Sequence, residues 1–377
     1  MPSATAPGPA ADDPAPARRR LGPTGRRAVK VLVGVLVGAF ALRVLVRLVG
    51  AVDWPAVGAA FRLLPWWAPV PLLAALLARQ VLNAVPLAVS VPGLPLRRSM
   101  QNDLAANLVA TMTPPPADVV LRVAMFRSWG IDAVRGMTGV TVNTLTFYSV
   151  RFLSPVLGAL LLTGQGLERR QWVTTGLCGT IAAVVLGGTL LLLRSDALAA
   201  TVGRSAGRLV RPVRRSTDPQ AWAARVVAFR ADSAGGLRRA LPRSVLALVG
   251  MVLADALVLL AALRMVGVPS ADLSTLDVVG GFLLAYPLTL LPLFGLGVLD
   301  AVLIGAWTVV AGHDLEPAMV AGTVVWRVVT IMGPWALGAL VLAAWRRSSG
   351  SAAEVVAAEA AAGEAAADPA PTAPTTL

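Results

Sequence analysis

Long apolar segments, each near the length needed to cross a bilayer, recur along most of the chain and constrain its fold more than any other feature. A helix needs about 20 apolar residues to cross a hydrocarbon core of about 30 Å. The chain is 56% hydrophobic and only 14% charged, whereas soluble domains carry about 25% charged residues. The sequence therefore predicts an all-α, polytopic membrane helix bundle. The expected spans are about 29–49, 67–89, 137–162, 173–193, 245–266, 278–291, 298–311 and 319–344.

The arginine clusters predict how these spans cross the membrane. Cytoplasmic loops of membrane proteins are enriched in basic residues. Placing the N-terminal arginines, Arg97 and Arg98, the basic segment 194–243, and Arg346 and Arg347 on one side requires an even number of crossings between each pair of clusters. Eight spans satisfy every requirement. We expect a multi-pass protein of the plasma membrane with both termini in the cytoplasm.

The segments outside the spans differ sharply in composition. Residues 1–27 are rich in proline and alanine and then basic, and 348–377 are of low complexity. Neither can bury a core, so both are expected to be disordered and to flank a membrane domain at 28–347. The segment 194–243 is expected to be a cytoplasmic loop. The net charge of +13 indicates contact with anionic lipid rather than with nucleic acid.

Two short stretches within the membrane domain are unsuited to an unbroken helix. One contains three prolines, at 114–116, and the other runs from Pro292 through Gly295 and Gly297 to Asp300. Proline removes a backbone donor and glycine loosens the chain. We expect re-entrant or broken helices near 102–130 and 286–300. Paired breaks in two halves point to a transport-type site near the midplane, and ordinary kinks are the alternative.

Ionisable residues lie within the predicted spans, where their burial is costly and usually functional. Arg79 and Asn83 are four residues apart and share a helix face, and Arg151, Asp255 and Arg327 lie in three other spans. The functional interpretation is a polar lining for a lipid or ion path. The alternative is that neighbouring carbonyls hold these arginines for packing alone. We expect Asp300 to pair with Arg327, and Asp255 with Arg79 or Arg151.

Several kinds of site are not expected. The chain has one cysteine, Cys178, and one histidine, His313, so an intrachain disulfide, a multi-cysteine metal site or a serine–histidine triad has too few residues. The spacing Gly295-x-Gly297-x-x-Asp300 lacks the preceding strand that a dinucleotide site requires. We expect no cofactor, no metal and no catalytic residue.

The two broken stretches carry a resemblance to a known family. The first half has Asn107, the break at 113–118, Arg122 and the run 125–130. The second half has Pro292, the run 295–300, Gly312, Arg327 and 333–338. With these features, residues 30–345 resemble the lysylphosphatidylglycerol synthase transmembrane-region family, also called flippase-like domain proteins. In the family the first break is glycine-rich, where this chain has prolines and Ala117, and the acid of the second is usually glutamate, where this chain has Asp300.

The resemblance implies a bacterial membrane protein that binds or translocates a phospholipid or other lipid-linked head group. In the full synthases this region moves aminoacylated phosphatidylglycerol between leaflets, and a separate soluble domain makes it. That domain is not seen here, so we expect a non-enzyme, with a separately encoded transferase as a candidate partner. The alternatives are a membrane transferase or accessory subunit acting on a lipid-linked sugar or aminoacyl lipid, and a scaffold. The expected head-group site comprises Arg79, Asn83, Asn107, Asp118, Arg122, Arg151, Asp255, Pro292, Gly295, Gly297, Asp300 and Arg327.

Overall fold

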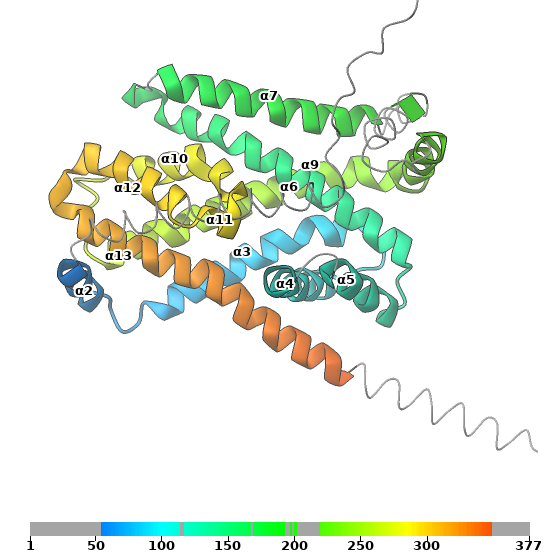
Figure 1. Cartoon of the computed structure of the whole chain (residues 1–377), viewed down its shortest axis with the longest axis horizontal. Coiled ribbons are helices and arrows are strands. Elements are labelled where there is room, and N and C mark those ends of the chain that lie inside the picture. Colours follow the sequence, from blue (N-terminus) through cyan, green and yellow to red (C-terminus); the bar gives the residue numbers. More distant parts are fainter. Residues whose placement is uncertain are drawn as a thin grey trace, which may run out of the picture. The chain divides into compact units, whose positions relative to one another are not determined.

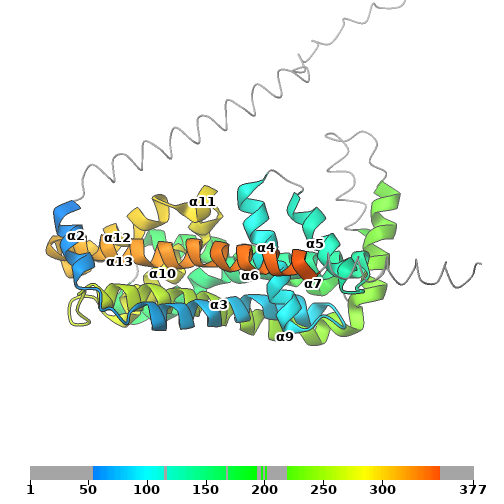
Figure 2. The same ribbon diagram turned by 90° about the horizontal axis from the view of Figure 1, so that it is seen from below.

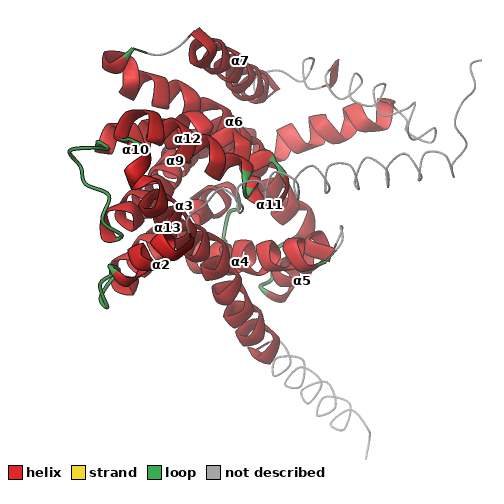
Figure 3. Cartoon of the chain, turned by 60° about the vertical axis from the view of Figure 1, so that its left-hand side comes forward, coloured by secondary structure: helices red, strands yellow, loops and turns green. Residues whose placement is uncertain are grey.

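A computed structural model describes residues 54–113, 117–166, 169–192, 197, 200, 201 and 219–348. Within them every regular element is a helix, which confirms the predicted all-α bundle (Figure 3). The predicted first span at 29–49, the prolines at 114–116, most of 193–218 and both terminal segments lie outside the described residues. The helices are α2 (Trp54–Arg62), α3 (Pro69–Ser90), α4 (Leu96–Met112), α5 (Ala117–Ser128), α6 (Ala133–Leu162), α7 (Arg169–Leu192), α9 (Pro219–Met265), α10 (Thr275–Ala285), α11 (Pro292–Gly295), α12 (Val298–Ala311) and α13 (Glu316–Arg327).

Five of the described helices are long and apolar enough to cross a membrane. They correspond to the predicted second, third, fourth, fifth and eighth spans. The last of them continues beyond α13 through a π-helical turn at Val328–Met332 and ends at Ser348. The crossing segments are Pro69–Ser90, Arg135–Leu162, Gln171–Gly188, Ala240–Met265 and His313–Ser348.

The predicted sixth and seventh spans are shorter than a full crossing and form a helical hairpin. At 14 residues, α12 is about 21 Å long, whereas the hydrocarbon core is about 30 Å thick. Figure 1 shows α10 and α12 side by side, with the short α11 at the turn between them. The 3-10 turn Tyr286–Leu290 and α11 form the tip of this hairpin, as the predicted break near 286–300 requires.

The tip of this hairpin depends on unusual backbone angles. Gly295 and Gly297 have φ of 70° and 83°, in the left-handed region that glycine enters without strain. Phe294 has φ of 58° and is the one residue other than glycine with positive φ in the described part of the chain. A Cβ at Gly295 would lie 2.5 Å from the Leu288 carbonyl oxygen. The tip therefore needs glycine at this position for space as well as for conformation.

The first break also forms a helical hairpin, made of α4 and α5. The two helices lie side by side in Figure 2 and contact each other. Ser99 near the start of α4 donates its hydroxyl to the Ala84 carbonyl of α3 at 2.6 Å, which fixes the base of the hairpin. The predicted re-entrant element at 102–130 thus has two helical arms, and the first begins earlier than expected, at Leu96.

The structure corrects two further predictions. Part of the predicted loop 194–243 is helical, because α9 begins at Pro219 and runs 47 residues without interruption into the fifth span. An arginine-rich segment cannot pack a core by itself, but a helix forms its own backbone hydrogen bonds, and this segment continues the helix of the packed fifth span. The expected link before the second span likewise contains α2, which packs against α13.

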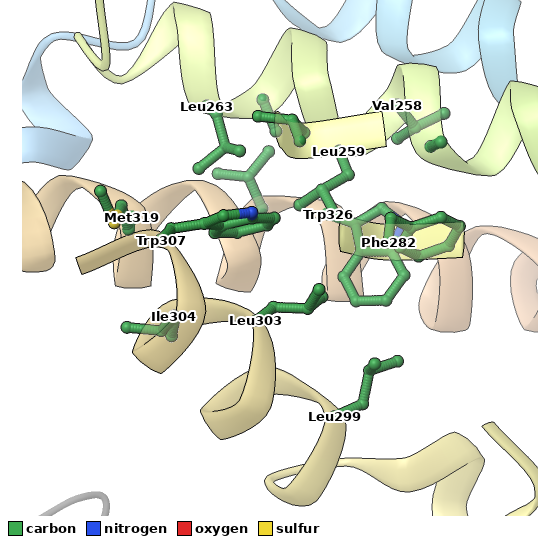
Figure 4. Close-up of a cluster of buried hydrophobic side chains, with 14 of the residues drawn as sticks. Val258, Leu259, Leu263, Phe282, Leu299, Leu303, Ile304, Trp307, Met319 and Trp326 are labelled. Carbon is green, nitrogen blue, oxygen red and sulfur yellow. The ribbon is translucent and has the colours of Figure 1, made fainter. Parts of the chain in front are cut away.

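The main core joins α9, α10, α12 and α13. Figure 4 shows Leu259 and Leu263 of α9 facing Trp307 and Trp326. Phe282 of α10 meets Trp326 edge to face, with ring centroids 5.5 Å apart, a geometry that aromatic pairs prefer. This packing holds the α10–α12 hairpin against the crossing helices α9 and α13. The hairpin tip is therefore attached to the main core.

Candidate functional site

A cavity of about 320 Å³ lies where the two hairpins meet the crossing helices α3, α6, α9 and α13. Its volume falls in the usual range for small-molecule sites, about 300–1,000 Å³. Residues from positions 79 to 335 contribute to its wall, so the fold brings distant polar residues together. Eight of the twelve predicted site residues line it: Arg79, Asn83, Asn107, Asp118, Arg122, Arg151, Asp255 and Arg327.

The expected Asp300–Arg327 pair is present. Arg327 places Nη2 and Nε each 2.8 Å from Asp300 Oδ1. Its Nη1 donates to the Phe294 carbonyl at 3.1 Å. The other oxygen of Asp300 accepts from the Gly297 backbone N–H at 2.8 Å. Arg327 therefore lines the cavity and also fixes both sides of the hairpin tip.

Among the other predicted residues, Gly295, Gly297 and Asp300 do not line the cavity, and the side chain of Pro292 lies outside the described part of the structure. They form the tip and the start of α12. For Asp300 the reason is its position: as the third residue of α12 it turns back to cap Gly297 and meets Arg327. In this geometry Asp300 meets Arg327 and Gly297, and its contact with a head group stays a prediction.

Asp255 pairs with Arg79, one of the two expected arginines. Arg79 Nε lies 3.3 Å from Asp255 Oδ2, and Arg79 Nη1 donates to Gln80 Oε1 at 2.7 Å. The indole N–H of Trp326 donates to Asp255 Oδ1 at 2.9 Å. Sequence reasoning missed Trp326, because a tryptophan beside an intramembrane arginine gives no signal of a partner 71 residues away.

Arg122 has a partner that the sequence analysis did not single out. Its Nη1 lies 2.8 Å from Asp103 Oδ1 and 2.7 Å from Asn102 Oδ1. The backbone carbonyl of Arg122 accepts a longer bond, 3.5 Å, from Asn102 Nδ2. These bonds tie α4 to α5. Asp103 is 8% exposed. The signal available in the sequence was an acid in one short helical segment followed by an arginine in the next.

Arg151 differs from the other three cavity arginines because it meets aromatic rings instead of a carboxylate. Its Cζ lies 4.5 Å from the ring centroid of Phe147, 5.7 Å from that of Tyr286 and 5.8 Å from that of Tyr148. The residue is 8% exposed, and its Nε has no hydrogen-bond partner. In the described residues no carboxylate forms an ion pair with it. The expected alternative pairing of Asp255 with Arg151 is thus not formed.

Burial makes this lone guanidinium costly. Cation–π contacts contribute about 0.5–2 kcal/mol each, whereas a buried ion without a counter-charge costs several kcal/mol. In the described residues, the one cavity carboxylate without an ion pair is Asp118, in the first turn of α5. A helix N-terminus stabilises negative charge at that position. Among the described residues, Arg151 is therefore the one cavity cation without an ion pair, as Asp118 is the one such anion.

A second hollow lies apart from this cavity. It is wide and open, about 850 Å³, and its lining includes the exposed Arg97 and Arg98 and the half-buried Gln101. Arg98 also lies over Trp129, 5.6 Å from its ring centroid. Its arginines belong to a cluster expected at the cytoplasmic surface. The enclosed cavity, with its buried charges, is the stronger candidate for a specific site.

The comparison with family models agrees with the fold. The model of a family described as "Lysylphosphatidylglycerol synthase TM region" matches residues 29–338. This match covers most of the chain, and the chain belongs to that family. It supports a membrane protein of lipid modification or flipping. No curated protein and no solved structure gives a significant match.

Proposed function

We propose that this member of the lysylphosphatidylglycerol synthase TM region family binds the phosphate of a lipid head group in the cavity and moves that lipid across the bacterial plasma membrane. The observation that carries the proposal is Arg151. It lines the cavity, is 8% exposed and has no carboxylate partner in the described residues. A phosphate oxygen would supply the missing counter-charge and accept from its free Nε. The guanidinium fork matches phosphate in charge and geometry.

The arrangement of the other arginines supports Arg151 as the phosphate ligand. Arg79, Arg122 and Arg327 each already meet a carboxylate. A phosphate would have to displace that carboxylate and leave it buried alone, which is unfavourable. Arg151 requires no such exchange. The three pairs therefore serve to hold the walls of the cavity, and one arginine remains for the ligand.

The hairpins supply a path for the head group. Irregular backbone at membrane depth is tolerated where it lines a cavity or lies within protein. Both hairpins contribute residues to the cavity wall, among them Asn107 and Asp118 from the first and Thr289 and Phe294 from the second. Movement of either tip would open the cavity toward one leaflet. The proposal contains no catalytic step and needs no cofactor.

Reconstitution in liposomes tests this function. The purified chain would be inserted into vesicles containing fluorescent phosphatidylglycerol, and lipid movement would be followed by quenching with an impermeant reductant. We expect wild type to move lipid faster than empty vesicles, Arg151→Gln to lose most of that rate, and Arg151→Lys to keep part of it. Arg62→Gln, an exposed arginine of α2, is the matched control and should behave as wild type.

Two results would refute the proposal. One is a wild-type rate equal to that of empty vesicles for every phospholipid class. The other is an Arg151→Gln protein that folds and moves lipid at the wild-type rate. Turnover of a lipid-linked sugar by the purified chain would instead support the transferase alternative.

A further inference from the structure

We propose that the acidic segment 349–377 of this chain docks into the open hollow at the first turn of α4, where Arg97 and Arg98 receive its carboxylates. The hollow has a volume of about 850 Å³, and Ser348, which directly precedes the acidic segment, lines it. This surface lies apart from the enclosed cavity. The inference therefore does not depend on the proposed function.

The open hollow is positively charged and contains no counter-charge of its own. Arg97 and Arg98 are exposed, and neither forms an ion pair with a described residue. Among the described residues that line the hollow, none is acidic, and the first turn of α4 also has no acidic residue. The N-terminus of a helix favours negative charge, whereas two cations there are unfavourably placed. The hollow therefore fits an anionic partner.

The donors at this turn are available to such a partner. The first N–H groups of a helix have no acceptor within the helix, and the N-cap residue Pro95 supplies no side-chain hydrogen bond to them. The guanidinium of Arg98 lies over Trp129, 5.6 Å from its ring centroid. A guanidinium stacked on a ring keeps the donors at its edge free for a carboxylate. Arg98 is thus held at the hollow in a geometry suited to an acid.

The end of the last crossing helix places the start of the acidic segment beside the hollow. Trp345 Nε1 donates to Ser128 Oγ of α5 at 3.0 Å, which holds this helix end against the first hairpin. Ser348 is the last described residue and lines the hollow. Gly350 follows, and glycine allows the chain to turn where other residues do not. Glu354 can lie up to about 20 Å from Ser348 along an extended chain, so its reach includes the hollow.

Charge distinguishes the acidic segment from the other long segments outside the predicted spans. Residues 1–27 and 194–243 both carry an excess of arginine, and Arg97 and Arg98 would repel them. Residues 349–377 contain no lysine, arginine or histidine. Their acids are spread along an alanine-rich sequence: Glu354, Glu359, Glu364 and Asp368.

The covalent connection compensates for the weakness of exposed ion pairs. Such pairs contribute little individually. A short flexible tether, however, raises the local concentration of the acids to the millimolar range. Contacts too weak to hold a separate peptide can therefore keep the hollow occupied within one chain. The competing occupant is an anionic phospholipid, which has the same charge but no tether.

Labelling of a cysteine in the hollow tests the inference on the full chain in neutral detergent without added lipid. In a Cys178→Ala background, Gln101→Cys would react with an uncharged maleimide. The comparison is with a second chain that also carries an amide segment, in which the four acids are replaced: Glu354→Gln, Glu359→Gln, Glu364→Gln and Asp368→Asn. Pro95→Cys, which also lines the hollow, serves if Gln101→Cys does not fold.

We expect the thiol to react about fivefold or more faster beside the amide segment, as a hollow occupied about 80% of the time requires. The difference should vanish in about 1 M salt, where the Debye length is about 3 Å. Asp272→Cys, in an exposed loop before α10, is the control for labelling. It should react at one rate with either segment.

Arginine variants identify the docking site. Arg97→Gln/Arg98→Gln should bring the ratio of the two rates close to one. Taking the ratio within each background cancels the direct effect of the arginines on the thiol. Arg62→Gln/Arg169→Gln removes two arginines that are also exposed but lie in α2 and α7. This matched control should keep the full ratio.

Three outcomes would overturn the inference. One is an equal rate beside the acidic and the amide segments at low salt. Another is a ratio that persists in Arg97→Gln/Arg98→Gln, because the acidic segment would then act elsewhere. The third is protection that requires added phosphatidylglycerol and is equal for both segments, which would identify an anionic lipid as the occupant. All three leave Arg151 and the proposed function untouched.

Discussion

At the scale of residues, the arginines of the cavity fall into two groups. Three of them meet carboxylates at 2.8–3.3 Å, whereas Arg151 meets aromatic rings and the hydroxyl of Tyr286 and forms no ion pair with a carboxylate among the described residues. Adjacent residues of α13 join two of these pairs, because Trp326 binds Asp255 and Arg327 binds Asp300. The paired arginines therefore contribute to one connected wall, and Arg151 stands apart from it.

Removal of one partner of the Asp300–Arg327 pair should destabilise the protein strongly. The side chains of Arg327 and Asp300 are 9% and 14% exposed, so Arg327→Gln leaves a largely buried carboxylate without its counter-charge. Such truncations cost about 3–5 kcal/mol. We expect a lower thermal unfolding temperature in detergent, measured by circular dichroism.

The double variant Asp300→Asn/Arg327→Gln removes both charges and should recover part of this loss. If the double variant is as unstable as the sum of the two single variants, the two residues do not act as a pair. The comparison must be made in the same detergent, since the surroundings set the cost of the lone charge.

The sequence allowed some of these partners to be predicted and not others. Asp300 and Arg327 were paired correctly because each is an ionisable residue in an apolar segment, and such residues seek each other. Asp103 was not predicted as the partner of Arg122, because it lies within α4 and not beside either break, where the predicted acids lie. The lack of a carboxylate partner for Arg151 was not predictable from the sequence, since it depends on which neighbouring helices place carboxylates beside the guanidinium and which place aromatic rings there.

At the scale of elements, the two helical hairpins determine the cavity. Their turns are marked in the sequence by prolines and glycines, so their positions were predicted to within a few residues. Their nature was not fully predicted: 278–291 and 298–311 were expected to be spans, and their helices are too short for that. Hydropathy alone does not separate a short span from one arm of a hairpin, because both are apolar on all sides.

Gly295→Ala should destabilise the tip of the α10–α12 hairpin. The new Cβ would lie 2.5 Å from the Leu288 carbonyl oxygen, at a residue with φ of 70°. Left-handed conformation costs a residue with a Cβ about 1–2 kcal/mol, and the clash adds to it. We expect a clear fall in unfolding temperature and faster proteolysis at the tip.

The matched control for this change is Gly305→Ala in α12. Nothing lies within 4 Å of a Cβ there, and alanine favours helix over glycine by about 1 kcal/mol. This variant should be as stable as wild type or more so. Equal loss of stability in both variants would show that the tip has no special conformation.

At the scale of the whole molecule, close helix packing holds the α10–α12 hairpin against the bundle. Gly158 of α6 and Gly280 of α10 lie at a contact where a Cβ on Gly158 would be 2.8 Å from the Gly280 carbonyl oxygen. Small residues allow helices in membranes to approach this closely. Gly158→Ala should therefore separate the two helices and lower the unfolding temperature, whereas Gly176→Ala, with open space around its Cβ, should not.

The membrane topology gives a sharper test, because the hairpin and the two-span alternatives place the tip differently. In both cases residues before α10 and after α12 lie on one side. Two full spans would bring the tip at 291–297 to the opposite, cytoplasmic surface. A re-entrant hairpin with a 14-residue arm reaches only about 21 Å into a core of about 30 Å, so its tip stays within the membrane.

Cysteine labelling distinguishes the two. In a Cys178→Ala background, which removes the single cysteine, Leu296→Cys at the tip should resist a charged maleimide applied to either side of intact membranes. Asp272→Cys and His313→Cys, both exposed, should react from one common side, and Ser348→Cys from the other. Rapid reaction of Leu296→Cys on the side of Ser348→Cys would establish two spans. The cavity would then lie beneath a cytoplasmic loop, and the head-group path would open to one leaflet only.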